Sequence, residues 1–216
     1  MRAIVSVSDK TGLVPFVQGL QEAGLEIYST GGTGRALEEG GVAVHGISEM
    51  TGFPEILEGR VKTLHPKVYG GLLAVRANEA HLRELAQNGI EPIDVVVVNL
   101  YPFMKTVARQ DVTMDEALEN IDIGGPTLLR AGAKNFPSVL VVVDPGDYGW
   151  VQERLRQGEV SLEERRGLAQ KAFQHVALYD TAIARYLRGD GDPLAQELTI
   201  GLTRIQSLRY GENPHQ

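Results

Sequence analysis

The sequence predicts an α/β fold built on a mostly parallel sheet, and two observations carry that prediction. Short apolar runs recur along the chain, and the first two, at residues 3–7 and 25–28, are each followed by a polar loop and a helical segment. Residues 95–98 are four consecutive valines, which is typical of a strand buried on both faces. Because strands alternate with helices, the carboxyl ends of the strands should meet at one edge of the sheet.

Each element has its own local signal. Asn78 and the capping boxes that begin at Thr113 and Ser161 mark the starts of helices. The pair Gly70-Gly71 makes residues 68–75 a weak strand or a turn. The predicted strands lie at residues 3–7, 25–28, 42–45, 95–98 and 139–143, and the predicted helices at 13–20, 35–39, 79–87, 113–119, 127–134, 148–156 and 161–187.

The composition bounds the class of protein. The 216 residues are enough for one domain, or for one domain with a small appendage. A net charge of −7 argues against general nucleic-acid binding, which needs clustered cations. There is no cysteine and the five histidines are scattered, so no metal site is expected. No apolar run is long enough to span a membrane, and we expect a soluble, cytoplasmic protein.

Residues 60–66 concentrate cations and hydrogen-bonding side chains. Arg60, Lys62, Thr63 and His65 are close together, and Pro66 discourages a helical conformation at His65. Arginine offers a planar fork for phosphate and lysine a movable point charge, so an extended loop of this kind suits an anionic substrate. A solvated basic loop beside a strand is equally consistent with these residues alone.

Two earlier loops also have features of anion sites. Residues 8–12 and 30–34 each lie between a predicted strand and a predicted helix, and both carry hydroxyl groups. Free N–H groups at helix amino-termini bind anions, and glycine lets the backbone approach them. Neither loop has the spacing of a P-loop or a dinucleotide fingerprint, and a tight turn would explain either one alone. Two such loops in tandem would face the same edge of the sheet.

Further candidates follow the valine strand. Asn99 and Tyr101 lie at its carboxyl end, where α/β sheets bind ligands, although Tyr101 could simply pack. Gly124 and Gly125 precede a proline that suits a first helical turn, which is another place for an anion or a carbonyl oxygen. Asp122, just ahead of them, could be only a helix cap.

The end of the chain has a different character. Residues 189–193 read as a hinge, and residues 194–216 finish in a polar, turn-rich stretch. That ending suggests the beginning of a further unit.

Seven motifs, in order, resemble the inosine monophosphate (IMP) cyclohydrolase domain of bifunctional purine-biosynthesis proteins. They are SVSDKTG at 6–12, STGGT at 29–33, TGFP at 51–54, RVKTLHP at 60–66, NLYPF at 99–103, DIGG at 122–125 and RAGAKN at 130–135. The resemblance covers residues 1–190 and implies a three-layer α/β/α fold of the methylglyoxal-synthase-like type. Residues 208–216 resemble the start of an aminoimidazole-carboxamide-ribotide (AICAR) formyltransferase domain. We therefore expect a domain at 1–190 and, at 191–216, a linker with the beginning of a second domain.

The resemblance also implies a reaction. The substrate would be 5-formamido-imidazole-4-carboxamide ribotide, whose carboxamide nitrogen attacks its own formyl carbon before water is lost to give IMP. No cofactor is implied. The expected partners are the purine nucleotide substrate, the IMP product and an AICAR formyltransferase domain, with a homodimer left open and with neither nucleic acid nor a membrane involved.

The family motifs assign roles to particular residues. Lys62 would hold the oxyanion, while Tyr101 and a pair formed by Asp122 and Lys134 would move protons. Without the family, Lys134 would be an ordinary lysine near a helix carboxyl end. The residues that the resemblance places around the nucleotide are Ser8, Asp9, Lys10, Thr30, Gly31, Gly32, Thr33, Arg60, Val61, Thr63, Asn99, Ile123, Gly124 and Gly125.

Two alternatives share this fold. Methylglyoxal synthase is a phosphate lyase, and the nucleotide-sensing domain of carbamoyl-phosphate synthetase binds without chemistry. Either would explain the phosphate loops. Neither explains the motif at residues 99–103 in combination with Lys62, Asp122 and Lys134.

Overall fold

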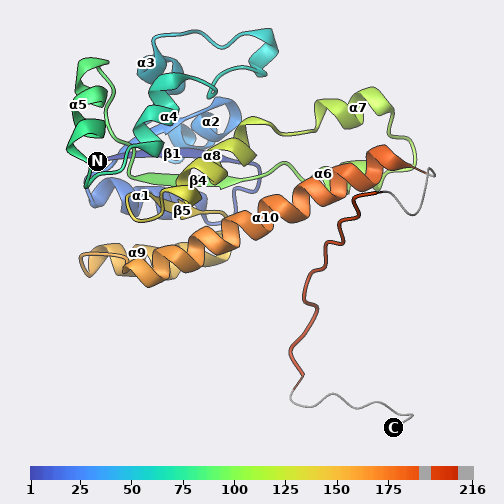
Figure 1. Cartoon of the computed structure of the whole chain (residues 1–216). Helices are drawn as coiled ribbons and strands as arrows, with labels where there is room; N and C mark the ends of the chain where they lie inside the picture. Colours follow the sequence, from blue (N-terminus) through green and yellow to red (C-terminus); the bar gives the residue numbers. More distant parts are fainter. Residues whose placement is uncertain (190–195, 209–216) are drawn as a thin grey trace.

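The computed structural model describes residues 1–189 and 196–208, and a five-stranded sheet lies at its centre (Figure 1). The strand order is β3-β2-β1-β4-β5, and every neighbouring pair is parallel. The predicted α/β class is confirmed. The strands are β1 (Arg2–Val7), β2 (Glu26–Ser29), β3 (His45–Gly46), β4 (Val95–Asn99) and β5 (Leu140–Val142).

Ten α-helices and two 3₁₀ turns surround the sheet in the described residues. The short 3₁₀ turns are η1 (Leu57–Gly59) and η2 (Pro145–Asp147). The α-helices are α1 (Leu13–Glu22), α2 (Gly31–Glu39), α3 (Ile47–Thr51), α4 (Pro66–Leu73), α5 (Glu79–Gln87), α6 (Phe103–Val107), α7 (Met114–Glu119), α8 (Gly124–Lys134), α9 (Tyr148–Arg156) and α10 (Leu162–Arg188).

The helices form two layers. Helix α1 packs against α2 and α9, whereas α8 packs against α4 and α10. The connections β1–α1–β2 and β4–α8–β5 run in opposite directions across the sheet, so right-handed crossovers put α1 and α8 on opposite faces. This is the three-layer arrangement that the resemblance implied.

The strand order reverses between β1 and β4, and that point positions the candidate site. The register of this pair sets Val7 opposite Asn99, so both strands end at the same level. Open α/β sheets bind ligands in the crevice beyond such a reversal. The loops after β1 and β4 therefore lie where a ligand is expected.

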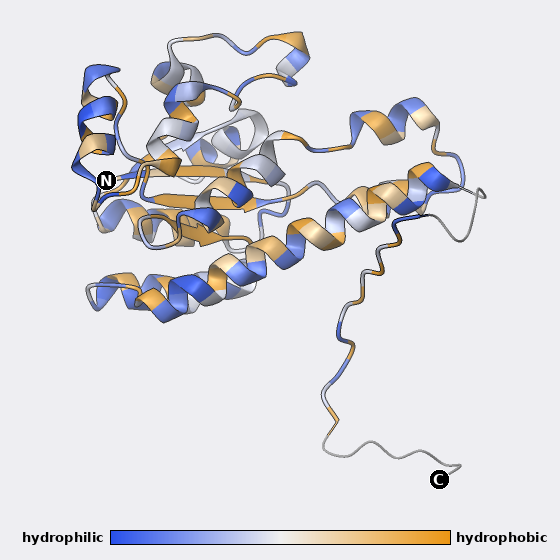
Figure 2. Ribbon diagram, viewed as in Figure 1, coloured by the Kyte–Doolittle hydropathy of each residue, from blue (hydrophilic) through white to orange (hydrophobic). Residues whose placement is uncertain are grey.

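The core explains why these strands form. Every residue of β4 is buried, and Ile4 and Val96, which pair across the centre of the sheet, are both fully buried. Figure 2 shows the strands as a continuous hydrophobic layer beneath helices whose outer faces are hydrophilic. Such double-sided burial accounts for the unbroken run of valines.

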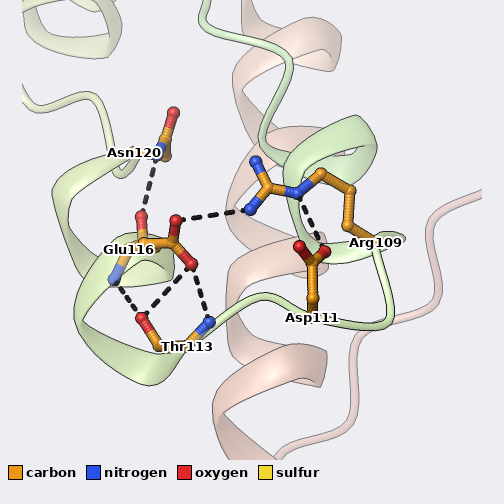
Figure 3. Close-up of polar contacts among 5 residues, drawn as sticks. All are labelled: Arg109, Asp111, Thr113, Glu116 and Asn120. Carbon is orange, nitrogen blue, oxygen red and sulfur yellow. Dashed lines mark hydrogen bonds and ion pairs between the residues drawn. The ribbon is translucent and has the colours of Figure 1, made fainter.

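The predicted helix starts are confirmed where capping residues signalled them. The side chain of Thr113 accepts the backbone N–H of Glu116 at 3.2 Å, and the Glu116 carboxylate accepts the N–H of Thr113 at 2.9 Å. Arg109 donates to the other oxygen of that carboxylate, and the side chain of Asn120 donates to the carbonyl of Glu116 (Figure 3). This network makes the short helix α7 locally self-supporting.

The prediction for residues 68–75 was wrong, because α4 is a helix. The pair Gly70-Gly71 predicts a weak strand or a turn, but in the structure both glycines are packing sites within the helix. A Cβ on Gly71 would stand 2.7 Å from the carbonyl oxygen of Glu91, and one on Gly70 would stand 3.1 Å from Ile90. The helix lies so close to the backbone before β4 that position 71 requires glycine, whereas position 70 is only tightly packed.

The boundaries of other elements also differ from the predicted ones. Helix α2 begins at Gly31 rather than at residue 35, so the glycine-rich loop forms its first turn. Strand β3 covers only His45–Gly46, because just two residues pair with β2. The short helices α3 and α6 were not predicted.

The tail differs from the rest of the described chain. Residues 196–208 have no helix or strand, and Leu202 and Ile205 are almost fully exposed. One contact to α10 is close, since a Cβ on Gly201 would stand 2.6 Å from Leu178. All of the predicted hinge (189–193) except Gly189, and the ending at 209–216, lie outside the described residues, so the domain boundary stays a prediction.

No helix within residues 1–189 and 196–208 is both long and apolar enough to cross a membrane. In the same residues, no three His, Cys, Asp or Glu side chains gather as a metal site would require.

Candidate functional site

The basic loop is held at both ends. Ile56 and Val61 form an antiparallel bridge around a turn in which Leu57 and Glu58 take left-handed backbone angles, with φ of 53° and 56°. At the other end, a ring nitrogen of His65 accepts a backbone N–H of the first turn of α4 at 3.2 Å. His65 is thus a helix cap, and the cations before it are presented from a fixed segment.

This loop lies against the amino-terminal end of α8. The ammonium of Lys62 is near enough to Asp122 for its charge to lower the pKa of that carboxyl group. Thr63 is buried, and its hydroxyl oxygen is 2.9 Å from where a Cβ on Gly124 would stand. The structure therefore brings Lys62, Thr63, Asp122 and Gly124 together, from segments about sixty residues apart.

Asp122 is the most constrained carboxylate of this cluster. Its Oδ1 accepts the backbone N–H of Gly125 at 2.9 Å. A Cβ on Gly125 would collide with the Asp122 carboxylate and would approach Leu100 to 2.8 Å, so this position requires glycine. Burial raises the pKa of Asp122 above its usual 3.8, and it outweighs the opposing effects of the Gly125 N–H and of Lys62. A carboxyl group poised in this way is a candidate acid or base.

Asn99 supports the loop after β1. Its amide oxygen accepts the N–H groups of Ser8 and Asp9 at 2.7 and 2.9 Å, and its NH₂ group donates to the carbonyl of Asp9 at 3.0 Å. The side chain is only 9% exposed. Asn99 therefore shapes the first anion loop, with most of its hydrogen-bonding capacity committed to the backbone.

The hydroxyls of the second loop are likewise committed to the sheet. Thr33 accepts the N–H of Val7 and donates to its carbonyl, both at 3.0 Å. Thr30 shares a 3.0 Å hydrogen bond with Ser6. Both threonines are buried, so they hold α2 against β1.

In these two loops, the groups that face solvent are a lysine side chain and backbone N–H groups, which are suited to bind an anion. Lys10, Gly31 and Gly32 are exposed, and nothing lies within 4 Å of a Cβ built on either glycine. The two glycines form the first turn of α2, whose N–H groups point out of the helix. A dianion would meet backbone donors and one lysine there.

Tyr101 lies at the rim of a cavity. Its side chain is 56% exposed, and it lines a cavity of about 430 Å³ together with Asn99, Phe103 and His175. This cavity opens at the carboxyl ends of β1, β4 and β5, on the β5 side of Asn99. Tyr101 is thus accessible from this cavity, whose lining does not include Lys62 or Asp122.

Two predicted site residues are not brought together with the others. Lys134 is the last residue of α8 and Asp122 precedes its first, so a rise of 1.5 Å per residue separates them by more than about 15 Å. Lys134 instead lines a groove of about 670 Å³ with Arg130, Arg166 and Phe173. The expected Asp122–Lys134 pair is therefore not formed within one chain.

Arg60 is also directed elsewhere, since its guanidinium pairs with Glu119 of α7. Both side chains of this pair are largely exposed. The pair is thus a surface contact that a ligand could replace at small cost.

One residue at the cluster was missed from the sequence. Tyr179 of α10 is 8% exposed, and its hydroxyl accepts the backbone N–H of Asp122 at 2.7 Å. The sequence predicts only a helix at residues 161–187, and nothing in its pattern indicates this contact. The contact can be seen only in the fold, because Asp122 lies 57 residues away in the sequence.

This fold defines a parallel α/β domain, and the cluster is a candidate site for an anionic ligand near the reversal of its strand order. The chain belongs to the family of MGS-like domains, whose model matches residues 12–127. A second model, that of the AICARFT/IMPCHase bienzyme, matches residues 132–216. The family inferred from the seven motifs is confirmed.

Relatives agree along the whole chain. The bifunctional purine biosynthesis protein PurH of Bacillus subtilis (strain 168) is 57% identical over 219 residues, which cover 100% of this chain and 42% of the relative. PurH of Bacillus cereus (strain B4264) is 58% identical over 217 residues, with the same coverage. This chain therefore spans about two fifths of the length of these relatives.

A solved structure has the same fold. The crystal structure of ForH superposes with a TM-score of 0.77 at 40% sequence identity. The match covers 87% of this chain and 98% of that chain. ForH therefore corresponds to nearly all of the folded part described above.

Proposed function

We propose that this chain is an IMP cyclohydrolase, which closes the ring of 5-formamido-imidazole-4-carboxamide ribotide with loss of water. The observation that carries the proposal is the cluster of Lys62 and Asp122 at the amino-terminal end of α8. Identity of 57% to a bifunctional purine biosynthesis protein over the full chain supports it. The enzyme would act in the last step of de novo purine synthesis, in the cytoplasm.

The reaction needs charge stabilisation and proton movement rather than a redox step. The carboxamide nitrogen forms a bond to the formyl carbon and loses a proton, while the formyl oxygen gains negative charge. Lys62 and the positive end of the α8 dipole would stabilise that charge. The oxygen then takes up two protons, one released by the carboxamide nitrogen and one by the formamido nitrogen. It leaves as water when its C–O bond breaks and the formamido nitrogen forms the ring C=N bond. The atoms balance without an oxidant or a cofactor.

The site would orient two arms of one substrate. Intramolecular attack already has a favourable proximity term, so fixing the carboxamide beside the formyl group is the main task of the protein. Asp122, with its raised pKa, is suited to exchange a proton with the carboxamide. Tyr101, exposed at the rim of the cavity, is the second candidate for proton transfer.

The phosphate would bind at the start of α2. The exposed first turn, Gly31 and Gly32, supplies backbone donors, and Lys10 supplies a charge. Thr30, Thr33 and Asn99 would act indirectly, because they hold the two loops in place. This refines the expectation that all of these side chains touch the nucleotide.

Lys134 can take part only if a second copy supplies it, because one helix separates it from Asp122. We therefore propose a homodimer in which α8 of one subunit brings Lys134 toward the cluster of the other. The groove around Lys134 is the part of the surface that such a partner would cover. In a longer protein, a formyltransferase region would follow.

The alternatives make different predictions in one assay. Incubating the formamido ribotide with the chain should give the ultraviolet spectrum of IMP, and Lys62→Ala should slow the change by roughly 10²–10³. A nucleotide sensor would bind IMP and leave the absorbance of the ribotide unchanged. A phosphate lyase would instead release inorganic phosphate from a triose phosphate. Either of these results would remove the cyclohydrolase assignment.

A further inference from the structure

One tyrosine of α10 contacts the backbone that carries the proposed acid or base. The hydroxyl of Tyr179 accepts the N–H of Asp122 at 2.7 Å and is 3.4 Å from the carbonyl oxygen of Asn120, to which it donates. The hydroxyl thus bridges two backbone groups of the segment between α7 and α8. Buried tyrosines usually find a hydrogen-bond partner. Here the partner is the backbone N–H of Asp122, so the bond also affects where the Asp122 carboxyl group lies.

This bond completes the immobilisation of Asp122. The carboxylate is held on one side by the N–H of Gly125 at 2.9 Å, and the backbone N–H is held on the other side by Tyr179. Constraints at the main chain and at the carboxylate leave little freedom for the bonds between them. The position of the carboxyl group relative to Lys62 then depends on α10.

The ring of Tyr179 supports a second part of the site. It packs edge-on against Phe103, with ring centroids 6.2 Å apart and an interplanar angle of 71°. Phe103 is fully buried, and its N–H donates to the carbonyl of Tyr101 at 2.8 Å. The same side chain therefore buttresses the strand end that presents Tyr101.

We propose that Tyr179 is a positioning residue that sets the geometry of Asp122 through its hydroxyl and of Tyr101 through its ring. The proposal rests on the cyclohydrolase function above. Misplacing a reacting group by about 1 Å can cost on the order of 100-fold in rate, so a support of this kind should be visible in kcat. In this role Tyr179, which lines the same cavity as Tyr101, acts through Asp122 and Tyr101 and not by a contact of its own with the substrate.

The variant Tyr179→Phe isolates the hydroxyl, because it keeps the ring against Phe103. We expect kcat to fall by about tenfold or more, while the Kd for IMP stays within about threefold, because the phosphate contacts lie elsewhere. Tyr186→Phe is the matched control. Tyr186 lies on the same face of α10 and packs against Phe103 at 5.7 Å, and within the described residues its hydroxyl makes no bond to the Asn120–Asp122 segment.

Equal losses of kcat in both variants, or a parallel fall of kcat and IMP affinity in Tyr179→Phe, would make the role of Tyr179 merely structural and overturn the proposal. The thermal midpoints of both variants should be measured with the same samples. A parent chain that does not form IMP would count against the proposed function rather than against the contact.

A measurement without turnover tests the contact directly. The backbone amide of Asp122 should exchange its hydrogen faster in Tyr179→Phe than in the parent, by about tenfold or more, because it loses its acceptor. Amides of β4 should be unchanged in the same spectra. An unchanged exchange rate at Asp122 would show that the hydroxyl does not hold this segment, whatever the chain catalyses.

Discussion

The two ends of α8 contrast sharply. At the amino-terminal end, Gly124 and Gly125 are packed so closely against Thr63 and Asp122 that no larger residue fits. At the carboxyl end, Lys134 is exposed beside an open groove. The family motifs predict catalytic residues at both ends, yet a rigid helix keeps them more than about 15 Å apart. Residues that a motif groups together in the sequence can therefore lie far apart in a single chain.

The largest expected effect tests whether both ends serve one reaction. Lys62→Ala and Lys134→Ala should each lower kcat by roughly 10²–10³, which corresponds to about 2.7–4 kcal/mol of transition-state stabilisation. Lys134→Ala should spare IMP affinity more than Lys62→Ala does. Steady-state kinetics and calorimetry measure the two quantities. If the kcat of Lys134→Ala stayed within about threefold of the parent value, only the amino-terminal end of α8 would belong to the site.

Mixing the same two variants sharpens the comparison. In a mixed dimer, one site would combine both substitutions and the other would have neither. If half of the dimers are mixed, about a quarter of the parent activity should return under two-fold symmetry. Coexpression of the two chains, with each variant alone as the control, measures this recovery. No recovery, with dimers demonstrated, would exclude a contribution across the interface.

A smaller effect is expected at the phosphate loops, which lie away from α8. Lys10→Ala should weaken IMP binding by about 1–3 kcal/mol, as for loss of a charge-assisted hydrogen bond, with an unchanged thermal midpoint. Thr33→Ala should weaken binding as well, but it should also lower the free energy of unfolding by about 1–3 kcal/mol, because it leaves the backbone groups of Val7 unpaired.

Calorimetry and thermal unfolding of both variants separate these outcomes. Unchanged IMP affinity in both would remove the phosphate site from this edge of the sheet. A Thr33→Ala chain as stable as the parent would mean that its hydroxyl contacts the ligand rather than the strand.

Asp122→Asn should change stability modestly and with a defined sign. Burial raises the folded-state pKa of Asp122, so its contribution to stability is fully present below about pH 3.8 and is lost as pH rises through the folded value. At neutral pH the ionised carboxylate is a cost, and its replacement by the neutral amide should raise the thermal midpoint while kcat falls. Melting curves from about pH 4 to 8 measure this, with Asp115→Asn on exposed α7 as the control. A midpoint lowered at neutral pH would contradict the inferred burial cost.

The smallest effect is expected at the tail. A chain ending at Asp190 should fold and keep kcat within about twofold, because residues 196–208 make few contacts with the site. Circular dichroism and the ultraviolet assay measure the two properties. A folded but inactive truncated chain would assign the tail to the site and move the predicted domain boundary.

The fold was largely predictable because its signals are local. A run of buried valines and three side-chain caps are readable from neighbouring residues. Helix α4 was not predictable in this way. Its glycines pack against Glu91 and Ile90, which approach from about twenty residues away, and no local pattern distinguishes such a contact from a helix breaker.

The candidate site shows the same limit. Residue types at the ends of β1 and β4 predict a site at this edge of the sheet, but they do not indicate what each side chain contacts. Asn99 and Thr33 have the chemistry of ligand-binding residues, and both bind backbone instead. The role of Tyr179 depends on a helix packing against a loop 57 residues earlier. The chemical character of each side chain could be predicted from the sequence, whereas the group that it contacts could be identified only from the fold.

The shortness of the two edge strands of the sheet has a further consequence. Strand β3 contributes only two residues and β5 only three, so the outer strands offer few unpaired backbone groups to another molecule. Long exposed edges are templates for strand addition and aggregation, and short ones are a common protection against it. The five buried residues of β4 lie inside, where no second chain can reach them. The short outer strands therefore leave little edge on which a further strand could extend this valine-rich sheet.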